Sequence, residues 1–481
     1  MAPTCSAEAL QLLQEGSLTL SRVEAAGVRI DTDYLDTTSA KIDQTIDTVT
    51  KRMKKHEIYT AWHRHFGPKT NLDSHRQLAT VLFEVMKFES NTVTATGKKS
   101  TTADALEDLE LDFVYDFQEV QHLKTKTQKT YLNGIRREMV KHADGFYYVH
   151  PFYNLHTAAT YRSSCNDPNF QNVPKRNPDM AKLIRPCYLP HPGHHMVEVD
   201  FSQLEVRIAA CYHKDPVMMK YIRDPKNDMH GDTAMKLFLL AKEDVCKKTT
   251  RDSTKNQFVF PEFYGSTYTN CARNIWKAMA RRNFRVGKDN DGIPIREHLA
   301  SKGVTERGDC VMGTEPRRGT FEYVCKQTED YFWNKMFRVY TEWKREWVDL
   351  YRKRGWFKML TGFVVKNGVY AKNDVINYPI QGSAFHCLLW CLIKIDKWFR
   401  KYKMRSRIIG EIHDSGVFSV HPKELQDFLT YARHVMTVLL PQHWRWINVP
   451  LETEADVSPV DHNWYTAAEY KLEDALWQLK A

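Results

Sequence analysis

Short stretches in which hydrophobic and polar residues alternate predict β-strands at three places in the chain: residues 196–199, 407–412 and 417–420. Apolar residues spaced three or four apart predict helices instead, and this pattern is clear over residues 10–28 and 204–211. The last two strands are joined by His-Asp-Ser-Gly, which is typical of a tight turn. The pattern therefore predicts a hairpin and a third strand within a helix-rich chain.

The pattern changes along the chain in four zones. Residues 1–150 are polar and helical in pattern, and residues 151–240 contain the first predicted strand. From about residue 245 to residue 350 the chain is charged and aromatic, whereas the remainder returns to strands and helices. This order predicts a sheet-bearing domain that is interrupted by a helical insertion.

Composition narrows the class of protein. A chain of 481 residues with 42% hydrophobic and 12% aromatic residues is long enough for about three domains and too apolar to be disordered. The longest apolar run, residues 384–395, is too short to span a membrane. Ten scattered cysteines without a CxxC pair are typical of reduced thiols, and the N-terminus has no pattern of a signal or transit peptide. We therefore expect a soluble, cytoplasmic protein.

The net charge of +10 matters mainly through its distribution. Separate basic clusters begin at Lys51, Lys124, Arg281 and Arg400. Such clusters can follow a phosphate backbone, although solvated helix faces explain them equally well. Charge alone therefore suggests that the protein binds nucleic acid but does not establish it.

Two aspartates lie where predicted strands end. Asp200 follows the strand at residues 196–199, and Asp414 lies in the turn of the predicted hairpin. Carboxylates at adjacent strand ends can hold two Mg²⁺ ions about 3.5–4 Å apart, an arrangement that serves phosphoryl transfer. An aspartate at a turn is more often a simple turn former, so neither residue is decisive in isolation.

A basic pair lies between these aspartates in sequence. Arg251 and Lys255 are spaced i, i+4 and would project from one helix face. Arginine can bind phosphate oxygens bidentately, and lysine supplies a point charge. The aromatic residues Phe258, Phe260 and Tyr264 follow and offer flat surfaces on which a base can stack. A basic amphipathic helix with an aromatic core side is the plainer interpretation.

Taken together, these segments resemble family A DNA polymerases, the bacterial DNA polymerase I type. Residues 200–207 (DFSQLEVR) resemble motif A of that family, Arg251…Lys255…Phe260…Tyr264 resembles motif B, and residues 412–414 (IHD) resemble motif C. Further segments match in the family's order: residues 160–162, 167–174 and 377–384, and the thumb-like residues 27–31, 71–74, 96–101 and 129–131.

The resemblance implies an α+β right-hand polymerase fold with a helical thumb, an antiparallel-sheet palm and helical fingers. The thumb would occupy residues 1–150 with an N-terminal lead-in to the palm, the palm residues 151–240 and 356–481, and the fingers residues 241–355. The implied activity is template-directed DNA synthesis, in which dNTPs are added to a primer 3′-OH with release of pyrophosphate. A role in phage or viral replication is expected, because the variant motifs look closer to bacteriophage members, and the location would then be the host cytoplasm.

The resemblance also implies roles for individual residues. The two Mg²⁺ ions, for which Mn²⁺ would be a substitute, would be bound by Asp200, Asp414 and the carbonyl of Phe201. The dNTP would be held by Arg251, Lys255, His230, Gln203, Glu205, Phe260 and Tyr264, with Lys255 placed to protonate the leaving pyrophosphate and Glu205 excluding the ribose 2′-OH. The primer-template would contact Arg162, Asn169, Gln171, Asn377, Gln381 and His413.

Motif B departs from the family pattern at two points. Lys255 lies nine residues before Tyr264 instead of eight, which predicts one extra residue absorbed as a π-bulge. Pro261 follows Phe260 where the family usually has glycine, so we expect the helix to kink or break at Phe260. Phe260 would face the sugar, and we expect discrimination against dideoxynucleotides.

Motif C departs as well, because Ser415 follows Asp414 where DNA polymerases usually have a second acid. The His-Asp-Ser motif is shared with single-subunit RNA polymerases, which makes an enzyme of that type the alternative. Glu205 in its Ser-Gln-Leu-Glu context favours DNA synthesis. A catalytically inactive DNA-binding relative and a two-metal nuclease are weaker hypotheses, since both aspartates are present but are not joined by a tighter acid cluster.

Thumb-like sequence begins within the first few tens of residues, so we expect no 3′→5′ exonuclease domain and no intrinsic proofreading. Asp31, Asp33 and Asp36 are interpreted as solvated or capping residues of the thumb. A separate exonuclease or processivity factor is a possible partner. An aromatic stripe in the predicted fingers is interpreted as core: Phe332, Trp333, Phe337, Tyr340, Trp343 and Trp347.

Overall fold

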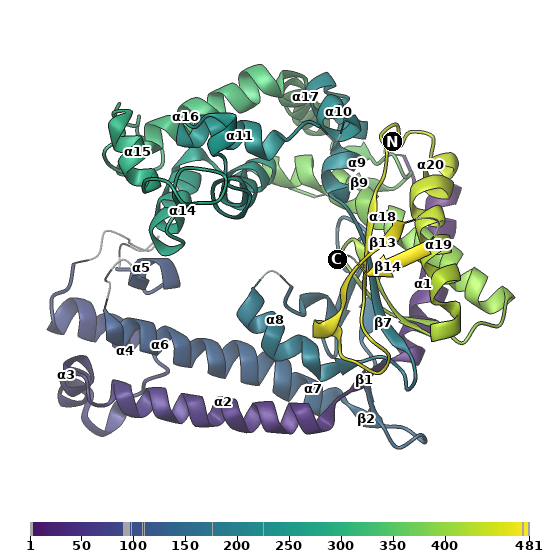
Figure 1. The fold of residues 1–481 in the computed structure, drawn as a ribbon, viewed down its shortest axis with the longest axis horizontal. Coiled ribbons are helices and arrows are strands. Elements are labelled where there is room, and N and C mark those ends of the chain that lie inside the picture. The colour runs from purple at the N-terminus through teal and green to yellow at the C-terminus, as the bar shows by residue number, and fades with distance from the viewer. Residues whose placement is uncertain are drawn as a thin grey trace.

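The computed structural model describes residues 3–89, 97, 99–107, 109, 111–175, 177–224, 226–366, 368–473 and 476–479. Thr96 and Lys98 of the predicted thumb segment lie outside this part of the chain. A sheet with helices behind it lies on one side of the molecule, and two helical arms extend from it (Figure 1). This combination of antiparallel sheets and separate helical regions confirms the predicted α+β class.

The central sheet has six strands in the order β10-β11-β7-β12-β13-β14, and all of its pairings are antiparallel. The strands span His195–Phe201 (β7), Arg407–Ile412 (β10), Ser415–Val420 (β11), Thr453–Val457 (β12), Ala468–Glu473 (β13) and Leu476–Leu479 (β14). The three predicted strands are therefore confirmed. The predicted hairpin is β10–β11, and the strand that carries Asp200 pairs directly with β11.

Two helices from opposite ends of the chain pack behind this sheet. Helix α1 (Ala7–Ala26) packs on helix α18 (Lys372–Lys401) and on β10. The stretch of α18 from Gly382 to Ile393 is continuously buried, as its apolar sequence requires. The close fit is visible at Gly16, where an added Cβ would lie 2.7 Å from Leu389. Helices α19 (Leu425–His434) and α20 (Leu440–His443) complete this layer.

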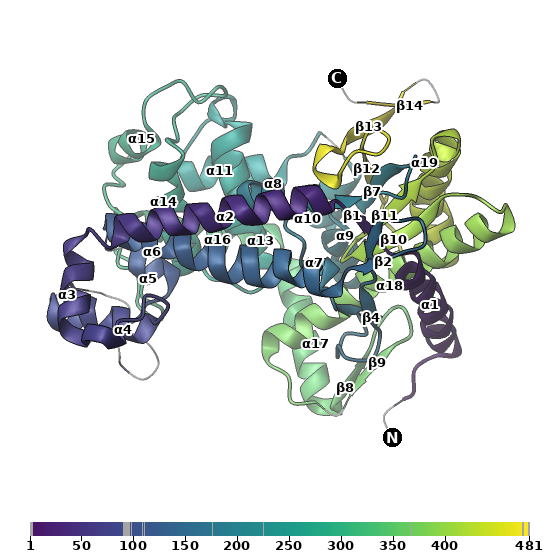
Figure 2. The ribbon, with the colours of Figure 1, turned by 90° about the horizontal axis from the view of Figure 1, so that it is seen from below.

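The first arm, here called the N-terminal arm, comprises residues 32–138. Its long helix α2 (Thr32–Met53) runs beside α6 (Asp112–His122), which continues through a π-helical stretch, Leu123–Leu132, into α7 (Asn133–Glu138) (Figure 2). Asp31 caps α2 by accepting a hydrogen bond from the Tyr34 N–H (2.9 Å), which confirms its predicted capping role. A separate hydrophobic cluster around Trp62 fills the tip, where the short helices are α3 (Glu57–Phe66), α4 (His75–Ala79) and α5 (Ala103–Glu107).

Smaller sheets link this arm to the central sheet. The second sheet has the order β2-β3-β1-β6, with strands Val140–Lys141, Tyr147–Val149, Val28–Ile30 and Tyr188–Leu189. A further hairpin pairs β4 (Phe152–Asn154) with β5 (Ser164–Asn166). Helix α8 (Pro178–Ile184) follows and leads through β6 to β7.

The second arm, here called the insertion arm, comprises residues 214–354 and follows helix α9 (Leu204–His213). Its helices are α10 (Pro216–Arg223), α11 (Met229–Phe238), α12 (Asp252–Thr254), α13 (Phe260–Phe263), α14 (Tyr268–Arg281), α15 (Ile295–Ser301), α16 (Phe321–Tyr331) and α17 (Arg338–Arg354). Phe332, Phe337 and Tyr340 are at most 2% exposed, so the aromatic stripe forms core as predicted. The chain returns to the sheet through β8 (Trp356–Lys358) and β9 (Val364–Lys366).

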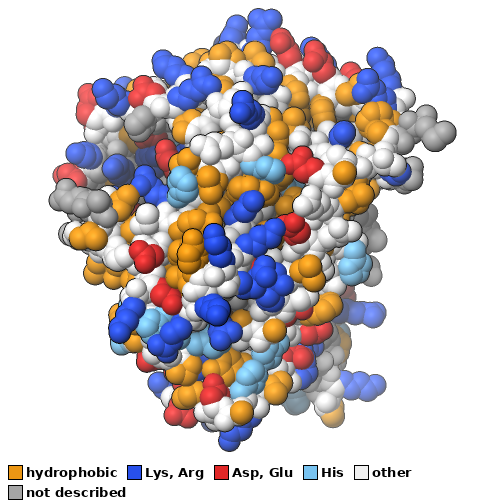
Figure 3. Space-filling model, turned by 90° about the vertical axis from the view of Figure 1, so that its right-hand side faces the viewer, with side chains coloured by type: hydrophobic (Ala, Val, Ile, Leu, Met, Phe, Trp, Pro, Cys, Tyr) orange, Lys and Arg blue, Asp and Glu red, His pale blue; other side chains and the backbone are white. Residues whose placement is uncertain are grey.

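The face formed by the sheet's supporting helices carries charge of its own. Lys and Arg side chains gather near the middle of the face in Figure 3. The predicted cluster that begins at Arg400 is exposed and lies at the end of α18. Asn377 and Gln381 lie near the beginning of that helix, and 30 residues correspond to about 45 Å of helix. This cluster is therefore remote from the residues predicted to contact DNA.

All ten cysteines are free thiols, and nine of them are buried. Among the described residues, no helix combines the length and the apolar character needed to cross a membrane. The expected cytoplasmic location stays a prediction.

Candidate active site

The sheet brings the two predicted metal-binding aspartates to the same end of neighbouring strands. Asp200 on β7 pairs with Ser415, the first residue of β11, and Asp414 immediately precedes Ser415. The Phe201 N–H donates a hydrogen bond to the Asp414 carbonyl (3.3 Å), which ties the turn to β7. His413 takes a left-handed conformation (φ 56°) that lets the hairpin reverse in a short turn. The predicted juxtaposition of Asp200 and Asp414 is thus what the fold produces.

The electrostatics of these aspartates suit a divalent cation. Burial, together with Asp200 and Glu205, raises the pKa of Asp414 to about 7, and burial also raises the pKa of Asp200. The Asp200 Oδ1 atom is buried and accepts no hydrogen bond. Hard oxygen ligands of this kind are those that Mg²⁺ prefers. Within the described residues there is no group of three or more His, Cys, Asp or Glu side chains with metal-binding geometry, so the fit rests on these two carboxylates.

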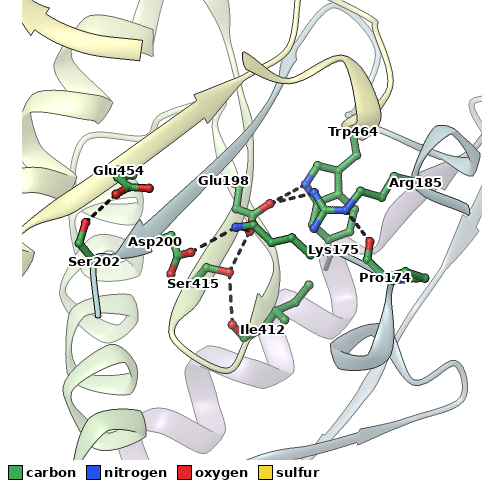
Figure 4. A network of polar contacts seen from close by, with 10 residues as sticks. All are labelled: Pro174, Lys175, Arg185, Glu198, Asp200, Ser202, Ile412, Ser415, Glu454 and Trp464. Carbon is green, nitrogen blue, oxygen red and sulfur yellow. Dashed lines mark hydrogen bonds and ion pairs between the residues drawn. The ribbon is translucent and has the colours of Figure 1, made fainter. Parts of the chain in front are cut away.

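A network behind Asp200 was not predicted from the sequence. Glu198, two residues earlier on β7, is 2% exposed and accepts hydrogen bonds from Lys175 Nζ (2.8 Å) and the Trp464 indole N–H (2.9 Å). Arg185 Nη1 (3.2 Å) and Ser415 Oγ (3.3 Å) donate to the same carboxylate. Figure 4 shows these side chains converging on Glu198, with Lys175 reaching on to Asp200. The signal in the sequence that could have indicated this network is the position of Glu198 between Val197 and Val199, because an acid inside an apolar strand needs partners.

The motif B segment forms a continuous but irregular helix. Two π-helical stretches, Lys247–Arg251 and Lys255–Val259, flank α12, so the extra residue predicted near Lys255 is accommodated as a π-turn. The Lys255 ammonium lies 5.4 Å from the centre of the Phe260 ring.

The predicted break at Phe260 is wrong. Phe260 is helical (φ −65°, ψ −48°), and the helix continues to Phe263. Proline normally disrupts a helix because it lacks an N–H and its ring meets the carbonyl four residues earlier. Here the residue four before Pro261 is Gln257, which lies within the π-turn, where hydrogen bonds span five residues and the carbonyls are displaced. The extra residue and the proline are therefore compatible with each other.

Three predicted phosphate-binding residues are brought together beside this helix. Arg251 donates to Asp228 through Nε (2.7 Å), and Asp228 directly precedes α11, which carries His230. Burial, followed by the charges of Arg251 and Lys255, lowers the pKa of His230 to about 4, so this imidazole is neutral at pH 7. The His230 ring meets the Phe260 ring edge-on, with centroids 5.8 Å apart.

A second contact joins the sheet to the end of the motif B helix. The Tyr264 hydroxyl donates to Glu205 Oε2 (2.5 Å), and Arg162 Nη1 lies 3.5 Å from Glu205 Oε1. Gln203, exposed and left-handed (φ 55°), forms the N-cap position of α9. Glu205 is thus held between the two predicted regions, palm and fingers.

The residues predicted to contact DNA are distributed more widely. Arg162 donates to His413 Nδ1 (3.4 Å), which places both beside the hairpin turn. Asn377 and Gln381 lie one turn apart on α18, and Asn169 is exposed at the start of a short 3-10 turn. These DNA contacts stay predictions.

Gln171 differs from this group because its amide points inward. It is 8% exposed and donates to Glu411 (2.5 Å) and to Ser163 Oγ (2.7 Å). Burial raises the pKa of Glu411 to about 7. The sequence did not single out Glu411, although it lies three residues before Asp414 on β10. In this structure Gln171 supports the motif C hairpin.

Comparison with known proteins places this geometry in context. The family described as DNA polymerase family A matches residues 33–282 and 333–466. The chain is 26% identical over 435 residues to a DNA polymerase of Bacillus phage SP01, covering 85% of this chain and 41% of that protein. It is 25% identical over 457 residues to DNA polymerase I of Bacillus subtilis, covering 94% of this chain and 45% of that protein. The chain thus spans less than half the length of these relatives.

A solved structure shows the same fold. The structure titled "POL domain of Pol1 from M. smegmatis complex with DNA primer-template and dNTP" matches with a TM-score of 0.71 and 22% identity, covering 95% of this chain and 70% of that chain. This likeness confirms the right-hand polymerase fold. The RNA polymerase alternative drawn from His413, Asp414 and Ser415 is not favoured by the relatives. By the extent of the family match, the chain belongs to DNA polymerase family A.

Proposed function

We propose that this chain catalyses template-directed DNA synthesis, adding dNTPs to a primer 3′-OH with release of pyrophosphate. The observation that carries the proposal is the convergence of Asp200 and Asp414 at one end of β7 and the β10–β11 hairpin, in a chain of this family. Asp200, Asp414 and the Phe201 carbonyl would hold two Mg²⁺ ions. When bound, such ions activate the attacking oxygen and neutralise charge on the leaving one.

The residues of the motif B helix would bind the triphosphate. Arg251 uses Nε to bind Asp228, which leaves its terminal nitrogens for phosphate oxygens. Lys255 would add a point charge and protonate the leaving pyrophosphate. Neutral His230 can donate one hydrogen bond to a phosphate oxygen from its buried position. Positioning and electrostatic stabilisation of this kind dominate phosphoryl transfer.

Glu205 and Tyr264 would select the sugar. Their 2.5 Å hydrogen bond closes the space between α9 and the end of the motif B helix. A ribose 2′-OH placed there would either meet the Glu205 carboxylate or break this bond, whereas a deoxyribose would do neither. We therefore expect preference for dNTPs over rNTPs, and Phe260 stays the predicted sugar-facing aromatic residue.

A primer-extension assay tests the proposal. Wild-type protein is incubated with a primed template, Mg²⁺ and either dNTPs or rNTPs, beside the variants Asp200→Asn and Glu454→Gln. Glu454 is the matched control, because it pairs with Asp200 across β7 and β12 and is exposed. We expect dNTP-dependent extension by the wild type and Glu454→Gln but none by Asp200→Asn. Extension that survives in Asp200→Asn, or its absence in the wild type, would overturn the proposal.

A further inference from the structure

Lys175 links the catalytic carboxylate to a buried anchor. Its ammonium lies 2.8 Å from Glu198 Oε1 and 3.2 Å from Asp200 Oδ2, while 49% of its side chain remains exposed. The lysine stands outside the central sheet, in the segment between Pro174 and α8. It therefore reaches the two acids of β7 from the side, as Figure 4 shows.

Glu198 is a rigid anchor. Apart from Lys175, it accepts hydrogen bonds from Arg185, Trp464 and Ser415. The Arg185 guanidinium is itself stacked on Trp464, with 4.2 Å between its Cζ and the ring centre. Because so many donors hydrogen-bond to the Glu198 carboxylate inside a strand, its orientation is fixed. The Lys175 ammonium that hydrogen-bonds to it is therefore held in a defined place.

The two oxygens of Asp200 are used differently. Oδ2 accepts the hydrogen bond from Lys175, whereas Oδ1 is buried and accepts none. An ammonium on one oxygen restrains the rotation of the carboxylate, so the other oxygen keeps one direction. The pairing of Lys175 with Glu198 also limits how strongly the ammonium neutralises Asp200.

We propose that Lys175, anchored on Glu198, is a positioning residue that holds Asp200 through Oδ2 and leaves Oδ1 for the metal ion. The proposal rests on the proposed function, because it assigns the lysine to the metal-dependent reaction at Asp200. The proposal predicts opposite effects of Lys175 and Glu198 on the binding of a cation at Asp200. Glu198 draws the ammonium away from Asp200, and Lys175 opposes the charge of an incoming cation.

The experiment measures Mn²⁺ binding by electron paramagnetic resonance without DNA, and kcat for primer extension at saturating Mg²⁺. In Lys175→Met the competing charge is gone, so Mn²⁺ should bind about fivefold more tightly. The kcat should nevertheless fall about tenfold or more, because Asp200 is no longer held. In Glu198→Gln the ammonium rests on Asp200 alone, and Mn²⁺ should bind about fivefold more weakly.

Three further variants complete the design. Lys175→Arg keeps a cation and should recover most of the kcat. Lys423→Met removes an exposed lysine beyond the opposite end of β11 and should change neither quantity. The double variant Lys175→Met with Glu198→Gln should bind Mn²⁺ with nearly wild-type affinity. Thermal unfolding of each variant identifies any that fail to fold, and the two Lys175 variants carry the test if Glu198→Gln is among them.

A purely structural role for Lys175 predicts weaker Mn²⁺ binding and a lower kcat together. That result, or unchanged values for both in Lys175→Met, would overturn the inference. Wild-type protein that binds Mn²⁺ but extends no primer would instead overturn the proposed function, so the two failures are distinguishable.

Discussion

Two regions of the molecule bury acids, and they balance the charge in different ways. At the central sheet, Glu198 and Asp200 share Lys175. In the insertion arm, Glu262 on α13 is 3% exposed, and Lys344, a cation that interacts with it electrostatically, lies 3.1 Å from the ring centre of Trp333. The first region carries cations within hydrogen-bonding distance of its acids, whereas the second places its cation on an aromatic face.

The oxygens of the two sites also differ. Glu262 accepts from Cys271 Sγ (3.6 Å) on one oxygen and from the Trp333 indole (2.8 Å) on the other, and its carboxyl also hydrogen-bonds to the carboxyl of Glu329. Burial and the neighbouring Glu329 raise the pKa of Glu262 to about 8, and burial lowers the pKa of Lys344 to about 7. The insertion arm therefore neutralises its acid with a proton. The sheet leaves Asp200 Oδ1 unpartnered, which is the condition for a metal ion.

The largest expected difference is between the primer-extension rates of two variants, Asp414→Asn and Glu262→Gln, in each of which an acid is replaced by its amide of the same shape. Under the proposed function, Asp414→Asn removes a charge that the metal ions would need, so primer extension should fall about a thousandfold, corresponding to the several kcal/mol that metal ions contribute. Glu262→Gln mimics the protonated acid, and its extension rate should stay within about threefold of wild type. Steady-state primer extension at pH 7 measures both. Comparable losses in the two variants would contradict the distinction between a metal site and a protonated site.

Truncation should show the same contrast in stability. Glu198→Ala leaves Lys175 and Arg185 without their buried partner and should lower the free energy of unfolding by about 3–5 kcal/mol. Glu262→Ala removes a neutral acid that accepts hydrogen bonds from Cys271 and Trp333, and this should lower the free energy of unfolding by about 1–3 kcal/mol. Urea unfolding followed by tryptophan fluorescence measures both, provided that each transition is two-state. A larger loss for Glu262→Ala would show that its carboxyl is ionised in the folded protein.

Much of the end of the sheet that carries the candidate active site was predictable from the sequence, because its signals are local. Alternation over residues 196–199 and the turn after residue 412 predict the strands that place Asp200 and Asp414. The extra residue before Tyr264, counted against the motif B spacing of the family that the chain resembles, predicts the π-turn.

Other features were not predictable because they depend on contacts distant in sequence. Lys175 is 23 residues from Glu198, and Trp464 is 266 residues from it, so nothing local indicates that they meet. The rule that proline breaks a helix failed at Pro261 because it assumes α-helical hydrogen bonding in the preceding turn. The domain boundaries at residues 150, 240 and 355 stay predictions.

The pH dependence of stability sharpens the comparison further. Because the pKa of Glu262 is raised from 4.5 to about 8, the folded protein keeps a proton that the unfolded chain releases. This contribution is complete below about pH 4.5 and is lost as the pH rises toward 8. The pKa of Lys344 is lowered to about 7, so this lysine makes the free energy of unfolding rise with pH, but only above about pH 7.

Between pH 5 and 7, the free energy of unfolding of the wild type should therefore fall by about 2 kcal/mol relative to Glu262→Gln. Urea unfolding of both proteins at several pH values measures the difference. Buried groups that do not interact with Glu262 titrate alike in both proteins, so their effects cancel in the comparison, whereas Glu329 hydrogen-bonds to Glu262 and belongs to the same titrating pair. Parallel pH profiles for the two proteins would show that Glu262 does not hold the proton.

The smallest effect, stabilisation by Mg²⁺ without DNA, separates the two regions most directly. A ligand that binds only the folded protein stabilises it by about 1.4 kcal/mol at ten times its dissociation constant, which is a shift of about 1–3 °C in melting temperature. Wild type and Glu262→Gln should both show this shift at pH 7.5, because both keep Asp200 and Asp414. Asp414→Asn should not, although its melting temperature without Mg²⁺ should equal or exceed that of the wild type, since burial disfavours the charged form of Asp414. A Mg²⁺ response that disappears in Glu262→Gln and persists in Asp414→Asn would place the metal in the insertion arm and reverse the comparison.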